Sequence, residues 1–523
     1  MSVEQADLAA APPRTAASAM EPDSAVVDRE ASALRFVQPF TFDGRTFAER
    51  AAAVEGSVWT GRRPLSVWRQ QQFPTTDLLA HVAEFLQPTD GTPRAAALWR
   101  MDEDALRSPA GLGGGRAHGG AAWTLHTPHS DIAFALHGVE LALFRHGVGF
   151  LAVRAQPLSD SPRDWFDFIH HFRFAAGERA PSLRAERRVQ PDGDGHAAAA
   201  AYFPPVAGAA AAPGAARYLG EILGGLLEQA ASGEQPSRWW REIFVPGVLL
   251  PYPSVYIDGG DATDGARTLY RLRNFFHADQ DARPGDQPGT AVMEYAERQW
   301  FFFSLNGGGF LARDAPADPF FRGTLPAHIE RQYFLLFLLA LQQRFVLMKL
   351  SQDVSRHWVS GATAAARATA FARIHDALLA FTAQGYFPQT MQEEHHHRYY
   401  EHWLRTFQIT QLYEQVSAEV REMHTDLELR ERERAGAAAE RREARMKATE
   451  RRFNRIGFLV GVPVWLFILV NSAVNVAVVR NAVAHAGPAG IQWYDMVLSL
   501  AVGVTGFGLG VLLYRVLSRS LRT

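Results

Sequence analysis

The sequence predicts an α/β cytoplasmic domain that continues into a long helical stalk and two C-terminal transmembrane helices. Two apolar runs without a charged residue, 456–479 and 496–514, each have about the 20 residues that a helix needs to cross a bilayer. Strand-like segments separated by glycine turns recur after residue 131, and no proline interrupts residues 389–462. We expect four parts: a disordered N-terminal tail at 1–33, the α/β domain at 34–325, a helical hairpin and stalk at 326–455, and a two-helix transmembrane hairpin at 456–523.

The first residues predict a polar tail followed by a strand. Residues 1–27 lack the basic segment and apolar run of a signal peptide. Residues 35–42 alternate before an Asp-Gly turn, so ordered structure should begin near Leu34. A short helix is expected at 77–86. The glycine-rich stretch 111–120 lacks the Gly-Lys-Ser/Thr ending of a phosphate-binding loop, and we interpret it as a surface loop.

A strand-hairpin-helix unit is predicted twice. The pattern Gly-x-Gly-Phe-Leu-Ala begins at Gly147 and again at Gly307. The first copy should contain strands at 132–136, 139–144 and 148–153 and a helix at 162–174, and the second should contain strands at 299–304 and 309–312 and a helix from Pro326. Between them we expect an alanine-rich insert at 196–216, a helix at 218–231 and a strand at 254–257. The two units should pair into one mixed sheet backed by helices.

Beyond residue 327 the pattern is helical. The apolar run 334–341 ends at two glutamines and an arginine, too early for a membrane span, and predicts a buried helix of a soluble bundle. A second helix is expected at 363–383. The stalk that follows has an apolar stripe up to Leu427, and the dense acid and base of 430–455 predict a solvated helix with ion pairs four residues apart.

The charges around the transmembrane hairpin predict its orientation. Seven basic residues lie within 441–455, and Arg515, Arg519 and Arg522 follow the second run, whereas the linker 480–495 contains one arginine, Arg480. By the positive-inside rule both termini lie in the cytoplasm. We therefore expect a multi-pass protein of a bacterial-type inner (plasma) membrane, with the lipid bilayer as a partner.

The first span carries a heptad seam of small, branched and polar residues. Its steps alternate between four and three and keep one face turned toward partner helices. The seam consists of Gly457, Gly461, Val464, Ile468, Asn471, Asn475 and Val478. The two asparagines should face protein or water. Two interpretations remain open: the amides join neighbouring helices by hydrogen bonds, or they surround a water-filled pore in an oligomer.

The composition excludes several classes of function. A net charge of −2 argues against a general nucleic-acid-binding protein, and the chain has no cysteine for disulfides, thiolate metal sites or thiol nucleophiles. No pairing of a nucleophile with a base stands out, so we do not expect an enzyme.

The strongest candidate for a metal site lies where the stalk begins. Residues 393–402 contain four histidines and three glutamates, and His397 and Glu401 are one helical turn apart, so they could share a metal such as Zn²⁺. The alternative is a solvated helix. A loop site formed by His277, Asp279 and Asp281 is weaker, because an ordinary turn explains the same residues. The pairs His170–His171 and His126/His129 are interpreted as surface or core histidines.

This order of parts resembles the CorA-type divalent-cation channels. The shared features are a cytoplasmic α/β domain, a long helical hairpin, a stalk entering the first of two C-terminal spans, a short external linker and a basic C-terminus. The resemblance implies a homo-oligomer, a pentamer in that family, whose first span lines the pore. By position, Asn471, Asn475, Ile468, Val464, Gly461 and Gly457 would be pore-lining. The family's Gly-Met-Asn signature is missing here, because no methionine occurs between Asn471 and Met496.

Two functions are therefore expected. The first is an oligomeric inner-membrane channel or transporter for a divalent cation such as Mg²⁺ or Zn²⁺, gated by the cytoplasmic domain. The polar heptad seam favours it. The second is a membrane-anchored ligand-sensing or effector protein of the same architecture without selective metal transport. The missing signature favours the second, and divergent relatives of this architecture include zinc transporters and membrane effectors of antiviral signalling.

Overall fold

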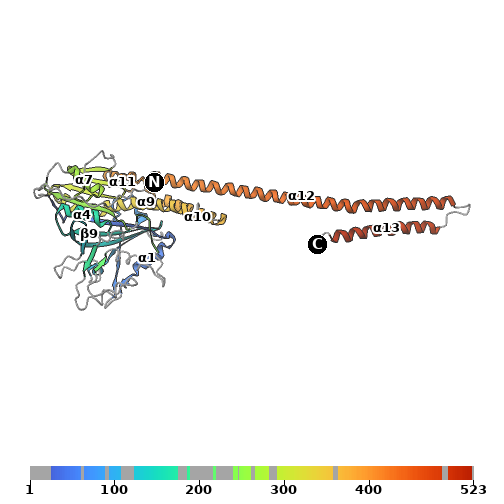
Figure 1. Ribbon diagram of the computed structural model, residues 1–523, viewed down its shortest axis with the longest axis horizontal. Coiled ribbons are helices and arrows are strands. Elements are labelled where there is room, and N and C mark those ends of the chain that lie inside the picture. Colours follow the sequence, from blue (N-terminus) through green and yellow to red (C-terminus); the bar gives the residue numbers. More distant parts are fainter. Residues whose placement is uncertain are drawn as a thin grey trace, which may run out of the picture. The chain divides into compact units, whose positions relative to one another are not determined.

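The computed structural model contains one large mixed sheet with helices on both faces, followed by two long helices (Figure 1). The structure describes residues 25–59, 64–88, 94–107, 123–174, 185–188, 216–218, 239–245, 247–260, 265–281, 291–356, 363–485 and 493–520. The glycine-rich stretch 111–120 and the insert expected at 196–216 lie outside these residues, except Ala216, which begins a strand. So does the helix expected at 218–231, except Tyr218, which ends a strand.

The strands of the main path form one sheet around two central strands, β2 and β13. Their order is β11 (Ala216–Tyr218), β10 (Ala185–Arg188), β7 (Trp123–His126), β8 (Asp131–Phe144), β9 (Val148–Pro157), β2 (Ala33–Thr41), β13 (Leu250–Asp258), β16 (Gly307–Arg313), β15 (Gln299–Ser304) and β14 (Val292–Ala296). Short strands extend it: β1 (Val26–Val27), β5 (Trp68–Gln71), β6 (Ala96–Met101) and β12 (Arg241–Glu242). A separate pair consists of β3 (Val58–Trp59) and β4 (Leu65–Ser66).

The two predicted hairpins lie in this sheet, as expected. The segments expected at 132–136 and 139–144 form one strand, β8, with an irregular register between Leu136 and Gly138. β9 pairs antiparallel with β2, and β16 pairs parallel with β13. Because β2 and β13 are themselves antiparallel, β9 and β16 point the same way. The matching residues of the two hairpins also share a face, because Phe150 and Phe310 belong to one core cluster and Leu151 and Leu311 to the other.

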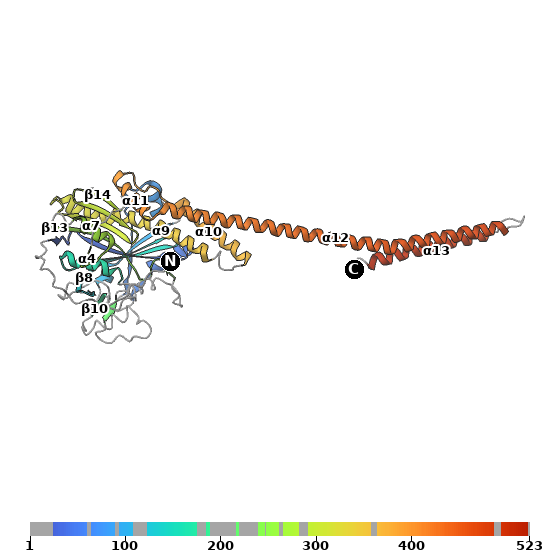
Figure 2. The ribbon, with the colours of Figure 1, turned by 45° about the horizontal axis from the view of Figure 1, so that its top comes forward.

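Alternation along the strands divides the core between two faces. Phe36 of β2 and Leu151 of β9 belong to one cluster, and Val37 and Phe150 belong to the other. The first face is covered by α1 (Phe47–Glu55), α4 (Pro162–Phe172) and α7 (Gly265–Asn274). The second is covered by α2 (Ala80–Leu86), α9 (Phe334–Val354), α10 (Ala364–Gln384), α11 (Glu394–Thr406) and the start of α12 (Ile409–His485). A short helix, α3 (Glu103–Arg107), follows β6. The helices after the two hairpins, α4 and α9, thus lie on opposite faces (Figure 2).

The most apolar helix of the sheet domain is a core helix. Two continuous helices, Phe320–Val354 and Ile409–His485, are long and apolar enough to cross a membrane. The first has 78% of its most apolar window buried, whereas the second has none. The helix Phe320–Val354 consists of two π-helical turns, η4 (Phe320–Thr324) and η5 (Ile329–Tyr333), on either side of α8 (Leu325–His328), followed by α9. The expected burial of residues 334–341 is confirmed, because the sheet itself covers them.

Order begins before the expected boundary at residue 34. Val27 donates its backbone N–H to the carbonyl of Asp160, and β1 pairs with β13. The carboxylate of Asp28 lies 2.9 Å from a guanidinium nitrogen of Arg322, which also binds Asp258 at 2.7 Å. Residues 25–33 therefore belong to the folded domain rather than to a disordered tail, because these contacts join them to β13 and η4.

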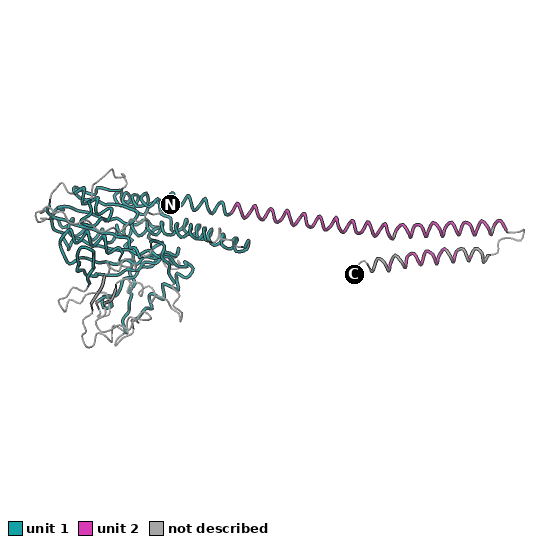
Figure 3. The backbone as a smooth tube through the Cα atoms, viewed as in Figure 1, with its two compact units in different colours: residues 1–423 teal, residues 424–523 magenta. Residues whose placement is uncertain are grey.

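The contacts divide the chain into two units, 1–423 and 424–523 (Figure 3). The division falls within α12 rather than near residue 326, because α9 and α11 pack on the sheet. Between residues 424 and 455 the described side chains of α12 are exposed or half-buried. Pairs four residues apart join Arg430 to Asp426 at 2.6 Å and Lys447 to Glu443 at 2.6 Å, as expected for a solvated helix. α12 continues through the first apolar run, and α13 (Trp493–Ser520) contains the second.

Candidate functional site

The asparagines of the first span lie against the second span. A Cβ atom added to Gly506 of α13 would lie 2.7 Å from the Nδ2 atom of Asn471, and one added to Gly503 would lie 3.7 Å from Nδ2 of Asn475. Both asparagines are half-buried, whereas Val474 between them is 49% exposed. Glycine at these positions lets the amide groups approach the backbone of α13 closely.

The other residues of the predicted pore-lining set divide between two environments. Gly461 and Val464 are half-buried, as the asparagines are. Gly457 is exposed, and Ile468 is 44% exposed. Within one chain, Asn471 and Asn475 lie close to α13, and hydrogen bonds from their amides to a neighbouring helix stay a prediction. A pore lined by these six residues stays a prediction.

A pair of engineered cysteines should report this arrangement directly. The chain has no cysteine of its own, so Asn475→Cys combined with Gly503→Cys introduces the only thiols. Because these positions face each other, oxidation in membranes should join the two spans within one chain. With a protease site added to the linker, the halves should stay together on a non-reducing gel after cleavage.

The matched control is Asn475→Cys with Gly508→Cys. A Cβ atom at Gly508 would have no neighbour within 4 Å, so this pair should not cross-link. Cross-linking of the control pair in preference to the Gly503 pair would contradict the contacts between Asn475 and α13.

The histidine-rich start of α11 gathers different residues from the expected pair. Ligand atoms of Glu393, His395 and His396 lie within 4.8 Å of one another. His397 is not in this group, and Glu401 forms an ion pair with Arg405 one turn further on. Helical spacing predicts that His397 and Glu401 meet. Glu393 instead precedes the helix, and its side chain turns toward the histidines that follow it.

This group has the features of a packed helix start. The ring of His396 is buried against Tyr333, with 4.9 Å between their centroids. Burial lowers the pKa of His396, and the adjacent His395 lowers it further. Its ligands all come from four consecutive residues, so nothing outside this turn completes a coordination shell among the described residues.

A second group comes from residues far apart in the sequence. His129 lies in the turn between β7 and β8, and His277 and Asp279 lie in the loop after α7. Their ligand atoms also lie within 4.8 Å of one another. The rings of His170 and His171, from α4, lie against the same loop. These histidines lie in separate segments of the sequence, and no local spacing predicts that they meet.

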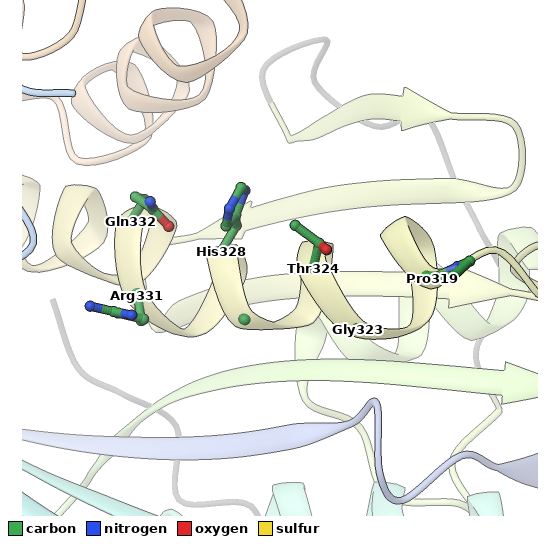
Figure 4. Close-up of a pocket in the computed structure, with 7 residues that line it drawn as sticks. Pro319, Gly323, Thr324, His328, Arg331 and Gln332 are labelled. Atoms are coloured by element: carbon green, nitrogen blue, oxygen red, sulfur yellow. The ribbon is translucent and has the colours of Figure 1, made fainter. Parts of the chain in front are cut away.

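A surface pocket next to the sheet domain's longest apolar helix has little to hold a ligand. It measures about 410 Å³ and lies along residues 319–332. Its lining side chains come from one continuous helical segment, as Figure 4 shows for His328, Arg331 and Gln332. Because one helix face forms the whole lining, convergent polar groups from other elements are missing from it.

Comparisons with known proteins add no assignment: no protein-family model, no curated protein and no solved structure matches this chain. The resemblance to CorA-type channels therefore stays a prediction.

Proposed function

We propose that this chain is a membrane-anchored ligand-sensing protein, with the α/β unit as the sensing body and the α12–α13 hairpin as the anchor. The observation that carries this proposal is the contact of Asn471 and Asn475 with the glycine face of α13. In an apolar span each amide needs a partner. Since the amides are turned to α13, the exposed surface of the span away from it is mainly apolar, with the small hydroxyl of Ser472 among its residues.

The charges and exposure of α12 support anchoring in a membrane. Large apolar side chains such as Leu459, Leu466 and Leu469 are 58–68% exposed in the single chain. Such a surface is stable in lipid but not in water. The basic residues at 441–455 support a cytoplasmic position for the α/β unit by the positive-inside rule. We therefore place the chain in the plasma membrane with both termini in the cytoplasm.

A cation channel is the second candidate. Gly457 and Ile468 belong to the heptad seam and yet are exposed, so they are available for contacts with further copies of the chain. A homo-oligomer, pentameric if the CorA resemblance holds, would surround its axis with this part of α12. To line such a pore, the asparagine side chains would have to turn away from α13 and toward the axis of the oligomer.

Ion flux into liposomes separates the two proposals. The purified full chain is reconstituted, and uptake of Mg²⁺ and Zn²⁺ is followed with trapped indicators, with an ionophore as the positive control. Under the sensor proposal, uptake should equal that of empty liposomes, because the amides of the span lie against α13 within the hairpin. The Asn471→Leu/Asn475→Leu variant should then behave like the parent.

Selective uptake by the parent chain that the double leucine variant abolishes would overturn the sensor proposal and support the channel. Leu466→Ala is the matched control, because its side chain is 58% exposed and lies outside the seam. It should leave flux unchanged in either case.

A further inference from the structure

Four histidines and a carboxylate meet at one place on the first face of the sheet. The ring centroids of His129 and His277 are 5.5 Å apart, and those of His170 and His277 are 5.3 Å apart. His171 lies 6.4 Å from both His129 and His277. Asp279 joins His129 and His277 in the group whose ligand atoms lie within 4.8 Å of one another. The five residues come from the β7–β8 turn, α4 and the loop after α7.

Several ring nitrogens of these histidines are left without a hydrogen-bond partner or with a free lone pair. Nδ1 of His170 lies 2.6 Å from the backbone carbonyl oxygen of Phe275, so it donates its proton there and leaves Nε2 as an acceptor. His171 is 5% exposed, and neither of its ring nitrogens has a hydrogen-bond partner among the described residues. The buried Nδ1 of His277 also lacks one. Unpaired buried nitrogens destabilise a fold, and a bound cation would offset that destabilisation.

Protonation does not satisfy these nitrogens near neutral pH. Burial, together with the neighbouring histidines and Arg173, lowers the pKa of His170 to about 4 and that of His171 to about 3. Both imidazoles are therefore neutral and keep a lone pair, which is the form that binds a metal.

The backbone around the cluster is held in place. The buried carboxylate of Asp167 on α4 accepts a hydrogen bond of 2.6 Å from the N–H of Ala278 and so fixes the loop that carries His277. Phe275 adopts a positive φ of 53°, which turns the chain after α7 and presents its carbonyl to His170. The turn with His129 is closed by Thr127, whose hydroxyl accepts the N–H of Ser130.

The positively charged side chain of Arg163 lies at the edge of the cluster. A guanidinium nitrogen of Arg163 is 2.5 Å from one carboxylate oxygen of Asp279. This exposed pair leaves the second oxygen for a ligand role, and His129 is also exposed. The cluster is thus open to solvent on the side of His129 and Asp279 and closed on the side of His171.

We propose that His129, His277 and Asp279 are the core ligands of a site for one divalent transition metal ion of the zinc class, with His170 and His171 beside them as neighbouring donors. Imidazole nitrogens select Zn²⁺, Co²⁺, Ni²⁺ or Cu²⁺, whereas Mg²⁺ requires oxygen ligands. This inference rests on the proposed sensing function in one respect, because it makes the metal ion the ligand that the α/β unit senses.

The test is metal binding by the full chain in detergent. After removal of metals with a chelator, Zn²⁺ is titrated in competition with a chromophoric chelator, and Co²⁺ is used to read coordination from its visible absorption. The parent should bind one Zn²⁺ per chain, and a large excess of Mg²⁺ should not displace it. The variant His129→Ala/His277→Ala should lose at least about 100-fold in Zn²⁺ affinity, since two ligands are missing.

Two controls accompany this variant. His126→Ala alters the same turn outside the cluster, and His395→Ala alters the group at the start of α11. Both should bind Zn²⁺ as the parent does. Because His129 is exposed and His277 half-buried, the double variant should keep the parent's thermal transition when no metal is present.

Unchanged Zn²⁺ affinity in the double variant would overturn the site, and so would loss of binding in His395→Ala or equal binding of Mg²⁺. These outcomes are independent of the flux experiment. Zinc binding together with selective ion uptake would refute the sensor proposal and leave the metal site standing.

Discussion

Replacing Gly309 by alanine should prevent the α/β unit from reaching its native packing. A Cβ atom at this position would lie 1.9 Å from the backbone carbonyl oxygen of Pro253 on β13. A backbone oxygen cannot rotate away as a side chain can, so β13 and β16 would have to separate where they pair in parallel. We expect a loss of at least about 3 kcal/mol, at the upper end of what overpacking produces.

The measurement is the thermal unfolding of the full chain in detergent, followed by tryptophan fluorescence, with the yield of folded protein. The matched control is Gly323→Ala, where the added Cβ would meet nothing within 4 Å. It should unfold like the parent. A native transition temperature for Gly309→Ala would mean that β13 and β16 are further apart than described.

Acidification should destabilise the α/β unit through His146. Burial, aided by the charge of Lys349, lowers the pKa of this residue to about 4 from an ordinary 6.5. Its ring packs against Phe85 and Phe381, and its Nδ1 lies 3.3 Å from the amide nitrogen of Gln342, which donates to it. The folded chain therefore holds this imidazole neutral.

The direction of the effect follows from which state binds the proton first. Below pH 6.5 the unfolded chain protonates His146, whereas the folded chain does so only near pH 4. The stability linked to this residue is complete above pH 6.5, declines as the pH falls, and levels off near pH 4. The total is about 3 kcal/mol, from a shift of two to three pKa units.

Unfolding by urea at a series of pH values measures this decline. In His146→Asn the curve should be flatter between pH 6.5 and 4, even if the variant is less stable at neutral pH. His375→Asn on α10 is the control, because that side chain is 43% exposed, and it should keep the slope of the parent. An unchanged slope in His146→Asn would show that other groups cause the decline.

Much of the fold was predictable because its signals are local. The alternating residues before Asp43 form β2, and the repeated glycine pattern at Gly147 and Gly307 forms two hairpins. The reason for the shared glycines is not local, however. Gly149 lies under the ring of Phe40 on β2 and Gly309 under Pro253 on β13, and these contacts exist only once the sheet is assembled.

The candidate site was predicted less well. The pairing of His397 with Glu401 assumed that helical spacing decides which ligands meet, but Glu401 binds Arg405 and the turn before the helix brings in Glu393. The histidines of the proposed metal site were recognised as residues but not as a group, because α4 and the loop after α7 are about a hundred residues apart along the chain.

Local sequence patterns were enough to predict the elements: the apolar runs near the C-terminus, the solvated helix before them and the strands of the hairpins. They were enough because hydrophobic periodicity and turn residues act over a few neighbouring positions. The tertiary structure alone decided that Asn471 faces Gly506 and that His129, His170 and His277 meet. Contacts between distant side chains depend on how the elements pack, and short-range patterns carry no information about that.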